Sequence, residues 1–301
     1  MELRCVAARE AKLLSILRQE LSMSSTLVKR LKYQNAYRVN GVPVHTDYPV
    51  RIGDTVTVLL DEPTPLYPAE DGELHILYED DSLIAVDKPA GMLVHPSSAC
   101  NTGTLANRLT AYYQRTGQPC AIHPVSRLDR DTFGVVLLAK NSHVHALMCA
   151  QSKAGRIEKN YHALVCGTPP EKEGVLSAPI ARKAPPSLLR CIRDDGKEAR
   201  TRYCLLRTDG QLSLLELQPL TGRTHQLRVH CAHFGFPILG DPQYGSEASC
   251  AVSERLGLSY QQLCAVRLAF CHPITGKNVE IRSDLDVRLD FLSDEIGRAH
   301  V

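Results

Sequence analysis

The sequence lacks the segments that would direct a chain into or across a membrane. No apolar run approaches the ~20 residues that a helix needs to cross a bilayer, and residues 1–4 do not lead into the apolar core of a signal peptide. Eleven cysteines are scattered along the chain without any Cys-x-x-Cys pair. An odd number of dispersed cysteines is typical of reduced thiols, not of a disulfide framework. We therefore expect a cytoplasmic protein with no membrane partner.

Several common catalytic and metal-binding motifs are also missing. There is no Gly-x-Ser-x-Gly nucleophile turn, no Walker-type phosphate loop and no Gly-x-Gly-x-x-Gly segment opening a βαβ unit. Four possible zinc ligands do lie close together in the sequence, namely His225, His230, Cys231 and His233. Their spacing matches no common structural zinc site, and no second ligand pair occurs elsewhere. The sequence therefore predicts no metal centre.

The composition is that of a folded protein with its positive charge gathered at one end. The chain has 301 residues, 44% of them hydrophobic, which is enough for one large domain or for a large and a small one. Residues 1–60 hold nine Lys or Arg against five Asp or Glu, whereas the remainder holds 26 against 28. A net charge of +4 at the front of a chain with +2 overall indicates a module that binds a polyanion.

Residues 1–60 show the pattern of two short helices followed by a hairpin. Apolar spacing of three and four predicts a helix over 11–21, and Ser24 or Ser25 is expected to cap a second helix that ends near Tyr33. An Asn-Gly pair at Asn40 and Gly41 predicts a tight turn, and residues 55–58 alternate as a closing strand. The second predicted helix bears the basic residues Lys29, Arg30 and Lys32.

This arrangement resembles the RNA-binding domain that is named after a ribosomal small-subunit protein. The matching features are the basic second helix, the segment 39–41 and the Gly53-Asp54 turn before the last strand. The resemblance implies that Lys29, Arg30 and Lys32 lie along phosphates and supply salt-sensitive affinity without base specificity. The alternative is a generic helix–helix–hairpin unit with a solvated basic face.

The remainder of the chain predicts a second, larger domain. Residues 61–73 are rich in proline and acidic residues and lack periodicity, so they are expected to be a linker, followed by a domain over 74–293 and a tail over 294–301. Short strands with hairpin-like spacing and few helices favour an α+β fold, with a mixed, mainly antiparallel sheet and flanking helices. Strands are expected at 75–80, 82–88, 135–139, 159–167, 201–206 and 212–217, and helices at 105–113 and after Asn141.

Three stretches of this domain carry residues suited to chemistry. The first is 123–134, which places a carboxylate, Asp129, in a polar loop that leads into a buried strand, a common place for catalytic groups. The second is the strand 159–167, whose alternation puts Tyr161 on the side of its buried residues. The third is 217–230, which contains two arginines and two histidines.

Taken together, these stretches resemble the RluA-type pseudouridine synthases over about residues 74–290. The motifs are Arg127-Leu128-Asp129-x-x-Thr132-x-Gly134, Lys159-x-Tyr161 and Thr221-Gly222-Arg223-x-His225-Gln226-Leu227-Arg228-Val229-His230, with Gly240-Asp241-Pro242 following. Two departures are Ser126, where the family often has histidine, and Phe133, where it usually has serine. Neither falls in the expected catalytic set, so they bear on the choice of target more than on the chemistry.

The resemblance implies an RNA uridine isomerase that needs no cofactor. Asp129 would either attack C1′ or remove a sugar proton, and the sequence leaves both routes open. Arg228 would keep that carboxylate charged and aimed. Tyr161 would stack on the uracil near the proton lost from C5. Arg127 would hold the uridine out of its stack, and Leu227 would line the base pocket.

Three questions stay open at the level of sequence. The favoured target is large-subunit ribosomal RNA, with transfer RNA second, and the chain is expected to act as a monomer. A catalytically silent RNA-binding or ribosome-assembly factor is the alternative from another class. A nucleoside-cleaving glycosidase would also act at C1′, but such enzymes usually use a pair of carboxylates, and Asp131 is the only second candidate near Asp129.

Overall fold

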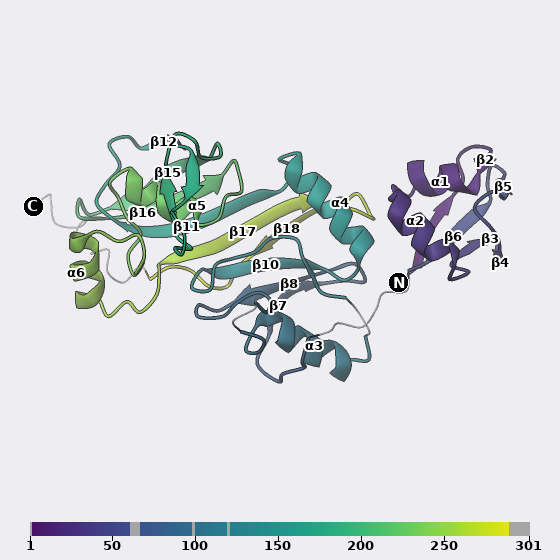
Figure 1. The fold of residues 1–301 in the computed structure, drawn as a ribbon, viewed down its shortest axis with the longest axis horizontal. Helices are drawn as coiled ribbons and strands as arrows, with labels where there is room; N and C mark the ends of the chain where they lie inside the picture. The colour runs from purple at the N-terminus through teal and green to yellow at the C-terminus, as the bar shows by residue number, and fades with distance from the viewer. Residues whose placement is uncertain (1, 61–66, 98–99, 119–120, 289–301) are drawn as a thin grey trace, which may run out of the picture.

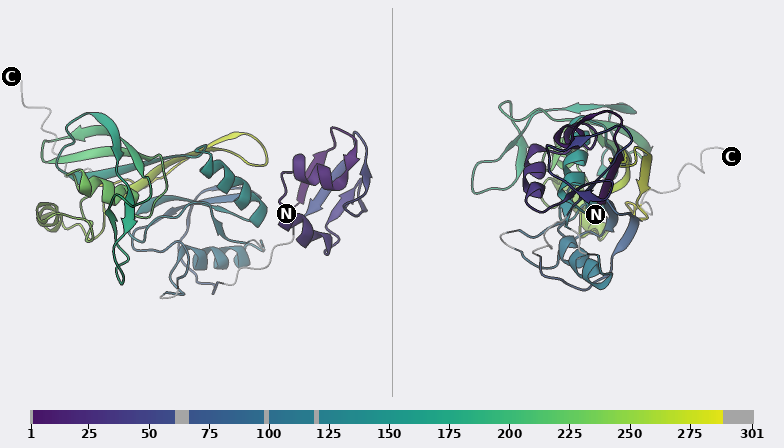
Figure 2. Two further views of the ribbon diagram at one scale, coloured as in Figure 1. Left: turned by 45° about the horizontal axis from the view of Figure 1, so that its top comes forward. Right: turned by 90° about the vertical axis from the view of Figure 1, so that its right-hand side faces the viewer.

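The computed structural model describes residues 2–60, 67–97, 100–118 and 121–288. A small N-terminal body lies at one end of a larger body, which is built on a long twisted sheet (Figure 1). A turn of 45° about the horizontal axis shows the same separation (Figure 2, left). Within the described ranges, no helix has the length and apolar character needed to span a membrane.

The N-terminal body contains both predicted helices and more strands than expected. Ser24 caps α2 by accepting a hydrogen bond from the Leu27 amide at 3.1 Å, as predicted. Asn40 and Gly41 have positive φ angles of 49° and 82°, which produce the predicted hairpin turn. The elements are α1 (Leu13–Gln19), α2 (Ser25–Lys32), β1 (Glu2–Val6), β2 (Ala11–Lys12), β3 (Tyr37–Val39), β4 (Val42–Pro43), β5 (Pro49–Val50) and β6 (Thr55–Leu59).

Two features of this body differ from the expectation. The first strand, β1, was not predicted, and it pairs with β6 in a four-stranded sheet of order β1-β6-β3-β4. The first helix begins at Leu13 because the two preceding residues pair with β5 as β2. The expected hairpin and closing strand therefore account for three of the four strands of this sheet, and β1 is the one that they omit. All sixteen buried residues of its core lie between Leu3 and Leu60, so this body packs on its own apolar centre.

The expected linker is only partly a connector. Residues 61–66 lie outside the described ranges, but residues 67–73 run against helix α3 (Leu105–Arg115). The Asn107 amide donates to the Pro68 carbonyl at 2.8 Å, and the Arg108 guanidinium donates to the Glu73 carbonyl at 2.8 Å. Tyr67 packs against the apolar residues beneath that helix. The second half of this segment is thus held by the larger body.

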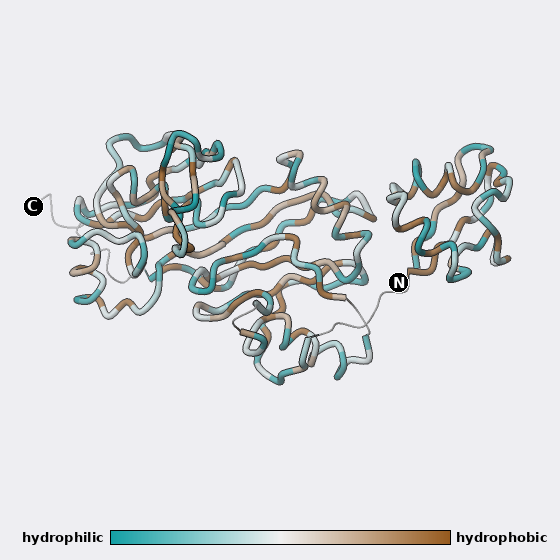
Figure 3. The backbone as a smooth tube through the Cα atoms, in the orientation of Figure 1, coloured by the Kyte–Doolittle hydropathy of each residue, from teal (hydrophilic) through white to brown (hydrophobic). Residues whose placement is uncertain are grey.

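The larger body is a mixed, mainly antiparallel sheet, as the sequence predicted. Its strands run in the order β12-β15-β16-β11-β17-β10-β8-β7, and the pair β10–β17 is the one parallel ladder within the described residues. The central strands are apolar (Figure 3). The strands are β7 (His75–Glu79), β8 (Leu83–Lys88), β9 (His123–Pro124), β10 (Phe133–Ala139), β11 (Glu158–Cys166), β12 (Glu173–Ser177), β13 (Ile180–Arg182), β14 (Arg190–Ile192), β15 (Arg200–Thr208), β16 (Leu212–Pro219), β17 (Leu263–Cys271) and β18 (Asn278–Arg282).

Helices cover both faces of this sheet. On one face, α3 packs over β8 and β10, and α5 (Gln226–His233) packs over β11 and β16. On the other face, α4 (Ser142–Lys153) packs against β8 and β10, and α6 (Glu247–Arg255) lies near β11. The predicted cap at Asn141 is present, because its side chain accepts from the Val144 amide at 2.9 Å. Tyr161 packs against the apolar clusters under both α3 and α5, so it marks the middle of the first face.

Candidate active site

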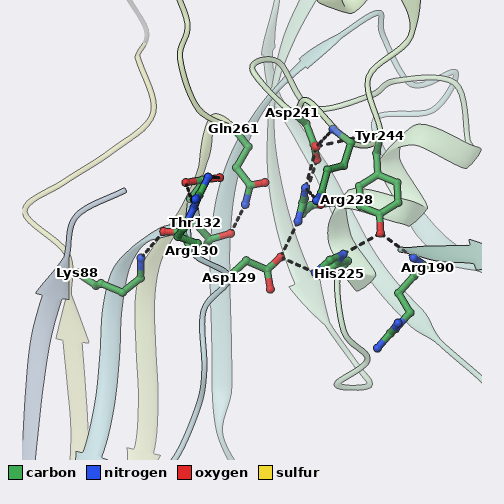
Figure 4. A network of polar contacts seen from close by, with 12 residues as sticks. Lys88, Asp129, Arg130, Thr132, Arg190, His225, Arg228, Asp241, Tyr244 and Gln261 are labelled. Atoms are coloured by element: carbon green, nitrogen blue, oxygen red, sulfur yellow. Dashed lines mark hydrogen bonds and ion pairs between the residues drawn. The ribbon is translucent and has the colours of Figure 1, made fainter. Parts of the chain in front are cut away.

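The loop between β9 and β10 holds Asp129 through three anchors. Leu128 is buried in the cluster under α3. Thr132 is buried and accepts a hydrogen bond from the Gln261 amide. The Lys88 ammonium donates to the Arg130 carbonyl at 2.9 Å (Figure 4). With its neighbours fixed on both sides, Asp129 has little freedom to move, which is what a reacting group requires.

Gly134, where this motif ends, is required by the close approach of two strands. It lies on β10 opposite Ala265 of β17 and has a φ of 101°. A Cβ atom at this position would lie 2.5 Å from the Ala265 carbonyl oxygen. No other residue type fits there without moving the central parallel ladder. The glycine therefore fixes where β10 begins, and with it the position of the loop that carries Asp129.

The third sequence stretch folds into a turn and then helix α5. Gln226, the first residue of the helix, is buried, and its side chain holds the preceding turn through hydrogen bonds. Its side-chain oxygen accepts from the Thr221 hydroxyl at 2.8 Å and from the Arg223 amide at 3.0 Å. Its side-chain nitrogen donates to the Arg200 carbonyl at 2.9 Å. This fixes the start of α5, so that Arg228, half a turn later, extends toward Asp129.

The guanidinium of Arg228 joins two carboxylates. Its Nη1 donates to Oδ2 of Asp129 at 3.0 Å. Its Nε and Nη2 donate to both oxygens of Asp241, at 2.7 and 2.8 Å, and Nη2 also donates to Gln243 at 2.8 Å (Figure 4). It lies over the Tyr244 ring, with its carbon 4.9 Å from the ring centroid. The structure thus brings together the predicted pair and adds a second carboxylate that aims the arginine.

The two carboxylates differ sharply in exposure. The Asp129 side chain is 29% exposed, whereas those of Asp241 and Arg228 are 1% and 5% exposed. Burial lowers the pKa of Arg228, but the hydrogen bonds and charge of Asp241 and Asp129 outweigh burial and raise it. The buried bidentate pair therefore fixes the guanidinium, and the exposed carboxylate is the one that a substrate can reach.

Tyr161 and Leu227 lie on the same face of the sheet beside this pair. Leu227 is buried and belongs to the cluster under α5, against which Tyr161 packs. Burial raises the pKa of the Tyr161 phenol above its ordinary value, and the nearby charge of Asp129 raises it further. The phenol therefore stays protonated in the empty site. This shift is opposite to the one that would make Tyr161 a base, so its resting role is that of an apolar ring with a neutral hydroxyl.

Comparison with known proteins identifies this arrangement. Residues 82–233 match the family model described as RNA pseudouridylate synthase. An uncharacterized RNA pseudouridine synthase of Chloroflexus aurantiacus is 40% identical over 273 residues, covering 90% of this chain and 84% of the relative. This chain belongs to the RNA pseudouridylate synthase family. Members of that family are isomerases, and the chain is an enzyme of this class.

Two further comparisons place the enzyme within the family. The ribosomal large subunit pseudouridine synthase C of Vibrio cholerae is 32% identical over 288 residues, covering 92% of this chain and 90% of the relative. The solved structure of human RNA pseudouridylate synthase domain containing 4 superimposes with a TM-score of 0.58 at 25% identity. That match covers 72% of this chain and 90% of the human chain. The pseudouridine synthase family and the mixed, mainly antiparallel sheet expected for the larger body are therefore confirmed.

The other predicted residues of the enzyme lie at or near its surface. Arg127 is exposed and makes no hydrogen bond or ion pair within the part of the chain that the structure describes. Its charge lowers the pKa of the nearby His95, after burial, which is the larger cause. Asp131 forms an ion pair with the adjacent Arg130 at 3.2 Å. The second carboxylate of the glycosidase alternative is thus engaged with its own neighbour.

The basic residues predicted to bind RNA are all exposed on helix α2 of the enzyme. They occupy its last turns, where their positive charge favours the carboxyl end of the helix dipole. The Arg30 guanidinium also lies 3.5 Å from the Ser142 hydroxyl at the start of α4. This set, Lys29, Arg30 and Lys32, lies on a different body from Asp129, so the two predicted surfaces are not brought into one site.

Sequence reasoning missed four polar residues of the site. Asp241 belongs to the Gly-Asp-Pro segment of the sequence motif, but nothing in the sequence gives it a role, because Gly, Asp and Pro are also common in exposed turns. Lys88 is fully buried, and its ammonium donates to the carbonyls of Pro89, Met92 and Arg130 at 2.8–2.9 Å. His225 and Tyr244 bond to each other at 2.7 Å. Only the folded chain brings these groups together.

The histidines that suggested zinc have other partners. The two ring nitrogens of His230 lie 3.0 Å from the Thr201 hydroxyl and 3.0 Å from the Ala178 carbonyl. His225 is engaged by Tyr244. Across the described residues, no group of three or more His, Cys, Asp or Glu side chains is arranged to hold a metal ion. These histidines therefore serve the packing of α5 and the surroundings of Asp129.

Proposed function

We propose that this enzyme isomerises specific uridines of large-subunit ribosomal RNA to pseudouridine. The observation that carries the chemistry is the contact between Asp129 and Arg228 at 3.0 Å, with Asp241 fixing the arginine from behind. The target rests on relatives named ribosomal large subunit pseudouridine synthase, including the Vibrio cholerae protein and one of Xanthomonas campestris that is 35% identical over 262 residues. The proposed place of action is the cytoplasm, and the proposed active form is a monomer.

The reaction breaks the bond from N1 to C1′, turns the uracil and joins C5 to C1′. Asp129 starts it as a carboxylate, either by attacking C1′ or by taking a sugar proton, and Arg228 stabilises the negative charge until that moment. After the new bond forms, C5 loses its proton and N1 gains one, so the balance is neutral and neither an oxidant nor water is consumed. We assign Tyr161 to stacking on the uracil, with its hydroxyl close to where the C5 proton leaves.

The substrate must leave its RNA stack to reach Asp129. Arg127 is suited to occupy the space that the uridine vacates or to bind its phosphate, because it is exposed and unpaired within the described residues. Leu227 supplies an apolar wall to the pocket beside Tyr161. We infer that these two residues bind substrate, and that Asp129, Arg228 and Tyr161 form the catalytic set.

We further propose that the N-terminal body is an RNA-binding domain of the ribosomal small-subunit protein type. Its support is the capped basic helix α2 and the Asn40-Gly41 hairpin, together with a core that is independent of the catalytic sheet. In this proposal residues 1–60 bind RNA through Lys29, Arg30 and Lys32, and the catalytic domain begins near residue 74.

The test is a map of pseudouridine in cells with and without the gene. Ribosomal and transfer RNA are mapped by carbodiimide modification after deletion, and again after return of the wild type or of Asp129→Asn. We expect one or a few large-subunit sites to disappear and to return only with the wild type. Loss of sites in transfer RNA would change the target, and an unchanged map would contradict the proposal and leave the silent RNA-binding factor or the glycosidase. Release of free uracil by the purified protein would indicate the glycosidase.

A further inference from the structure

Three groups beside the active site form a directed chain of hydrogen bonds. The backbone amide of Arg190 donates to the Tyr244 phenol oxygen at 2.9 Å. That phenol lies 2.7 Å from Nδ1 of His225 (Figure 4). Burial raises the pKa of Tyr244, so the phenol keeps its proton. The amide can only donate, so among the described residues His225 Nδ1 is the acceptor within reach of the phenol proton.

This chain determines which nitrogen of His225 bears hydrogen. A neutral imidazole has one donor and one acceptor nitrogen, and the partner of one nitrogen sets the state of the other. With Nδ1 accepting from Tyr244, the hydrogen lies on Nε2. The backbone of His225 also constrains the ring, since its φ of 56° is in the left-handed region and the residue begins α5 from there. The ring is therefore held in one tautomer and one orientation.

The Nε2 atom of His225 faces the same oxygen of Asp129 that Arg228 holds. Nε2 lies 3.9 Å from Asp129 Oδ2, and Arg228 Nη1 lies 3.0 Å from that oxygen. Oδ1 of Asp129 makes no hydrogen bond or ion pair within the described part of the chain (Figure 4). The two oxygens of this carboxylate are thus unequal: one is held from two sides, and the other is open.

We propose that His225, locked in its Nε2–H tautomer by Tyr244, is a positioning residue that works with Arg228 on Oδ2 of Asp129 and so makes Oδ1 the atom that reacts with the uridine. This inference rests on the proposed role of Asp129. Small closure of the pocket around a flipped nucleotide brings Nε2–H from ion-pair distance into a hydrogen bond with Oδ2. The neutral donor then stabilises the carboxylate without neutralising it, so Oδ1 retains its reactivity.

The charge state of His225 matters because an imidazolium would change the carboxylate. Burial lowers the pKa of His225, and the groups that face it act in both directions: Asp129 and Asp241 raise it, whereas Arg228 and Arg190 lower it. If His225 is protonated at low pH, it forms an ion pair with Asp129 and weakens Oδ1 as a nucleophile or base. The rate should therefore fall as the pH drops through the pKa of His225.

The tautomer can be tested without any substrate. In full-length protein labelled with nitrogen-15 histidine, the two ring nitrogens of a neutral histidine have different chemical shifts, and His225→Gln identifies the signal by its loss. We expect Nε2–H in the wild type and a mixture of tautomers in Tyr244→Phe, which keeps the ring under Arg228. Tyr203→Phe, at another buried tyrosine, is the matched control and should change nothing. An Nδ1–H tautomer in the wild type would overturn the proposal.

The role of the hydrogen bond between Tyr244 and His225 in the reaction is tested by the pH dependence of the single-turnover rate on a substrate RNA. Tyr244→Phe removes a bond that only neutral His225 can accept, so the acidic fall in rate should move to higher pH by on the order of one unit. His225→Gln keeps a donor that cannot titrate, so the rate that remains in this variant should lose that fall. Identical pH profiles for all three proteins would overturn the proposal. A wild type that modifies no RNA would instead reject the proposed function, and the tautomer measurement would still stand.

Discussion

The two bodies of this enzyme use charge in opposite ways. In the N-terminal body, no charged side chain is among the buried residues of the described range 2–60. Its basic residues on α2 are exposed. In the larger body, three charged residues around the candidate active site are almost inaccessible to water, namely Lys88, Asp241 and Arg228.

The difference shows what each kind of charge can provide. An exposed lysine attracts phosphates at a distance, but it is screened by salt and adopts many positions. A buried arginine loses hydration, which costs several kcal/mol unless its partners replace it, and it keeps one position. In the proposed function, the N-terminal body therefore supplies affinity for RNA without precise placement. In the larger body, the buried and fully paired Arg228 holds Asp129 within hydrogen-bonding distance of its Nη1 atom.

The largest effect on the reaction rate should come from Asp129, the more accessible of the two carboxylates that Arg228 contacts. Asp129→Asn removes the reacting charge, and we expect the single-turnover rate to fall by at least ~10³-fold with thermal unfolding nearly unchanged. Asp131→Asn is the matched control, because its carboxylate pairs with Arg130 instead. It should lower the rate by less than about tenfold. Equal losses in both variants would mean that the two carboxylates act together, as in a glycosidase.

Removing the buried partner of Arg228 should affect stability as well as rate. Asp241→Asn keeps the shape of the side chain but removes its charge. Among the described residues, Asp129 is then the one carboxylate that the Arg228 guanidinium contacts. We therefore expect a loss of about 3 kcal/mol in the free energy of unfolding. Lys29→Met on the exposed helix should change it by less than ~0.5 kcal/mol. Chemical denaturation of both variants measures the contrast. A loss below about 1 kcal/mol for Asp241→Asn would show that burial of this pair does not hold the site together.

The buried ammonium of Lys88 should make the free energy of unfolding depend on pH. Burial lowers the pKa of Lys88 to about 8, against an attraction to Asp131 and Asp129 that raises it. Below about 8, the folded and unfolded chains both bind this proton, and stability does not depend on it. Between about 8 and the unfolded value near ~10.4, only the unfolded chain binds it, so the free energy of unfolding should rise with pH by up to ~3 kcal/mol from this group.

This contribution is isolated by comparing the wild type with Lys88→Met across that range. Buried tyrosines and cysteines titrate in both proteins, so their effects cancel in the difference. The wild type should gain stability relative to the variant as the pH rises above 8. A constant difference would show that the three carbonyl acceptors keep Lys88 charged throughout.

What the sequence predicts well is local. Ser24 caps a helix by a hydrogen bond with the Leu27 amide, only three residues away. Asn40 and Gly41 form a turn because both residue types readily adopt positive φ angles. The strand β1 alternates in burial, but it has only five residues and its partner, β6, lies about fifty residues later, so the sequence alone does not show that it joins a sheet. The composition of residues 67–73 predicts a linker because it does not reveal their attachment to α3, which includes backbone carbonyls that accept from Asn107 and Arg108 as well as the side chains of Tyr67 and Asp71.

The same limit applies to the site. Asp129 and Arg228 are 99 residues apart, and it was the resemblance to a family that joined them, whereas periodicity could not. Asp241 and Lys88 were missed because their role depends on burial, and a charged side chain is by default expected to be exposed. His225 suggests a metal ligand in the sequence because other histidines and a cysteine lie close to it. Its backbone conformation and its bond to Tyr244, which give it another role, exist only in the folded chain.

The smallest effect on stability, and the one that tests the exposed half of the comparison, concerns α2. Lys29→Gln with Lys32→Gln removes two charges and leaves Arg30, which also contacts Ser142. Each phosphate contact contributes about 0.7–0.9 to the slope of log affinity against log salt, so the slope should become shallower by ~1.5. Lys153→Gln with Arg156→Gln is the matched control at the end of α4, on the face of the sheet opposite Asp129. If both doubles reduce the slope equally, RNA binding depends on total charge and not on this helix.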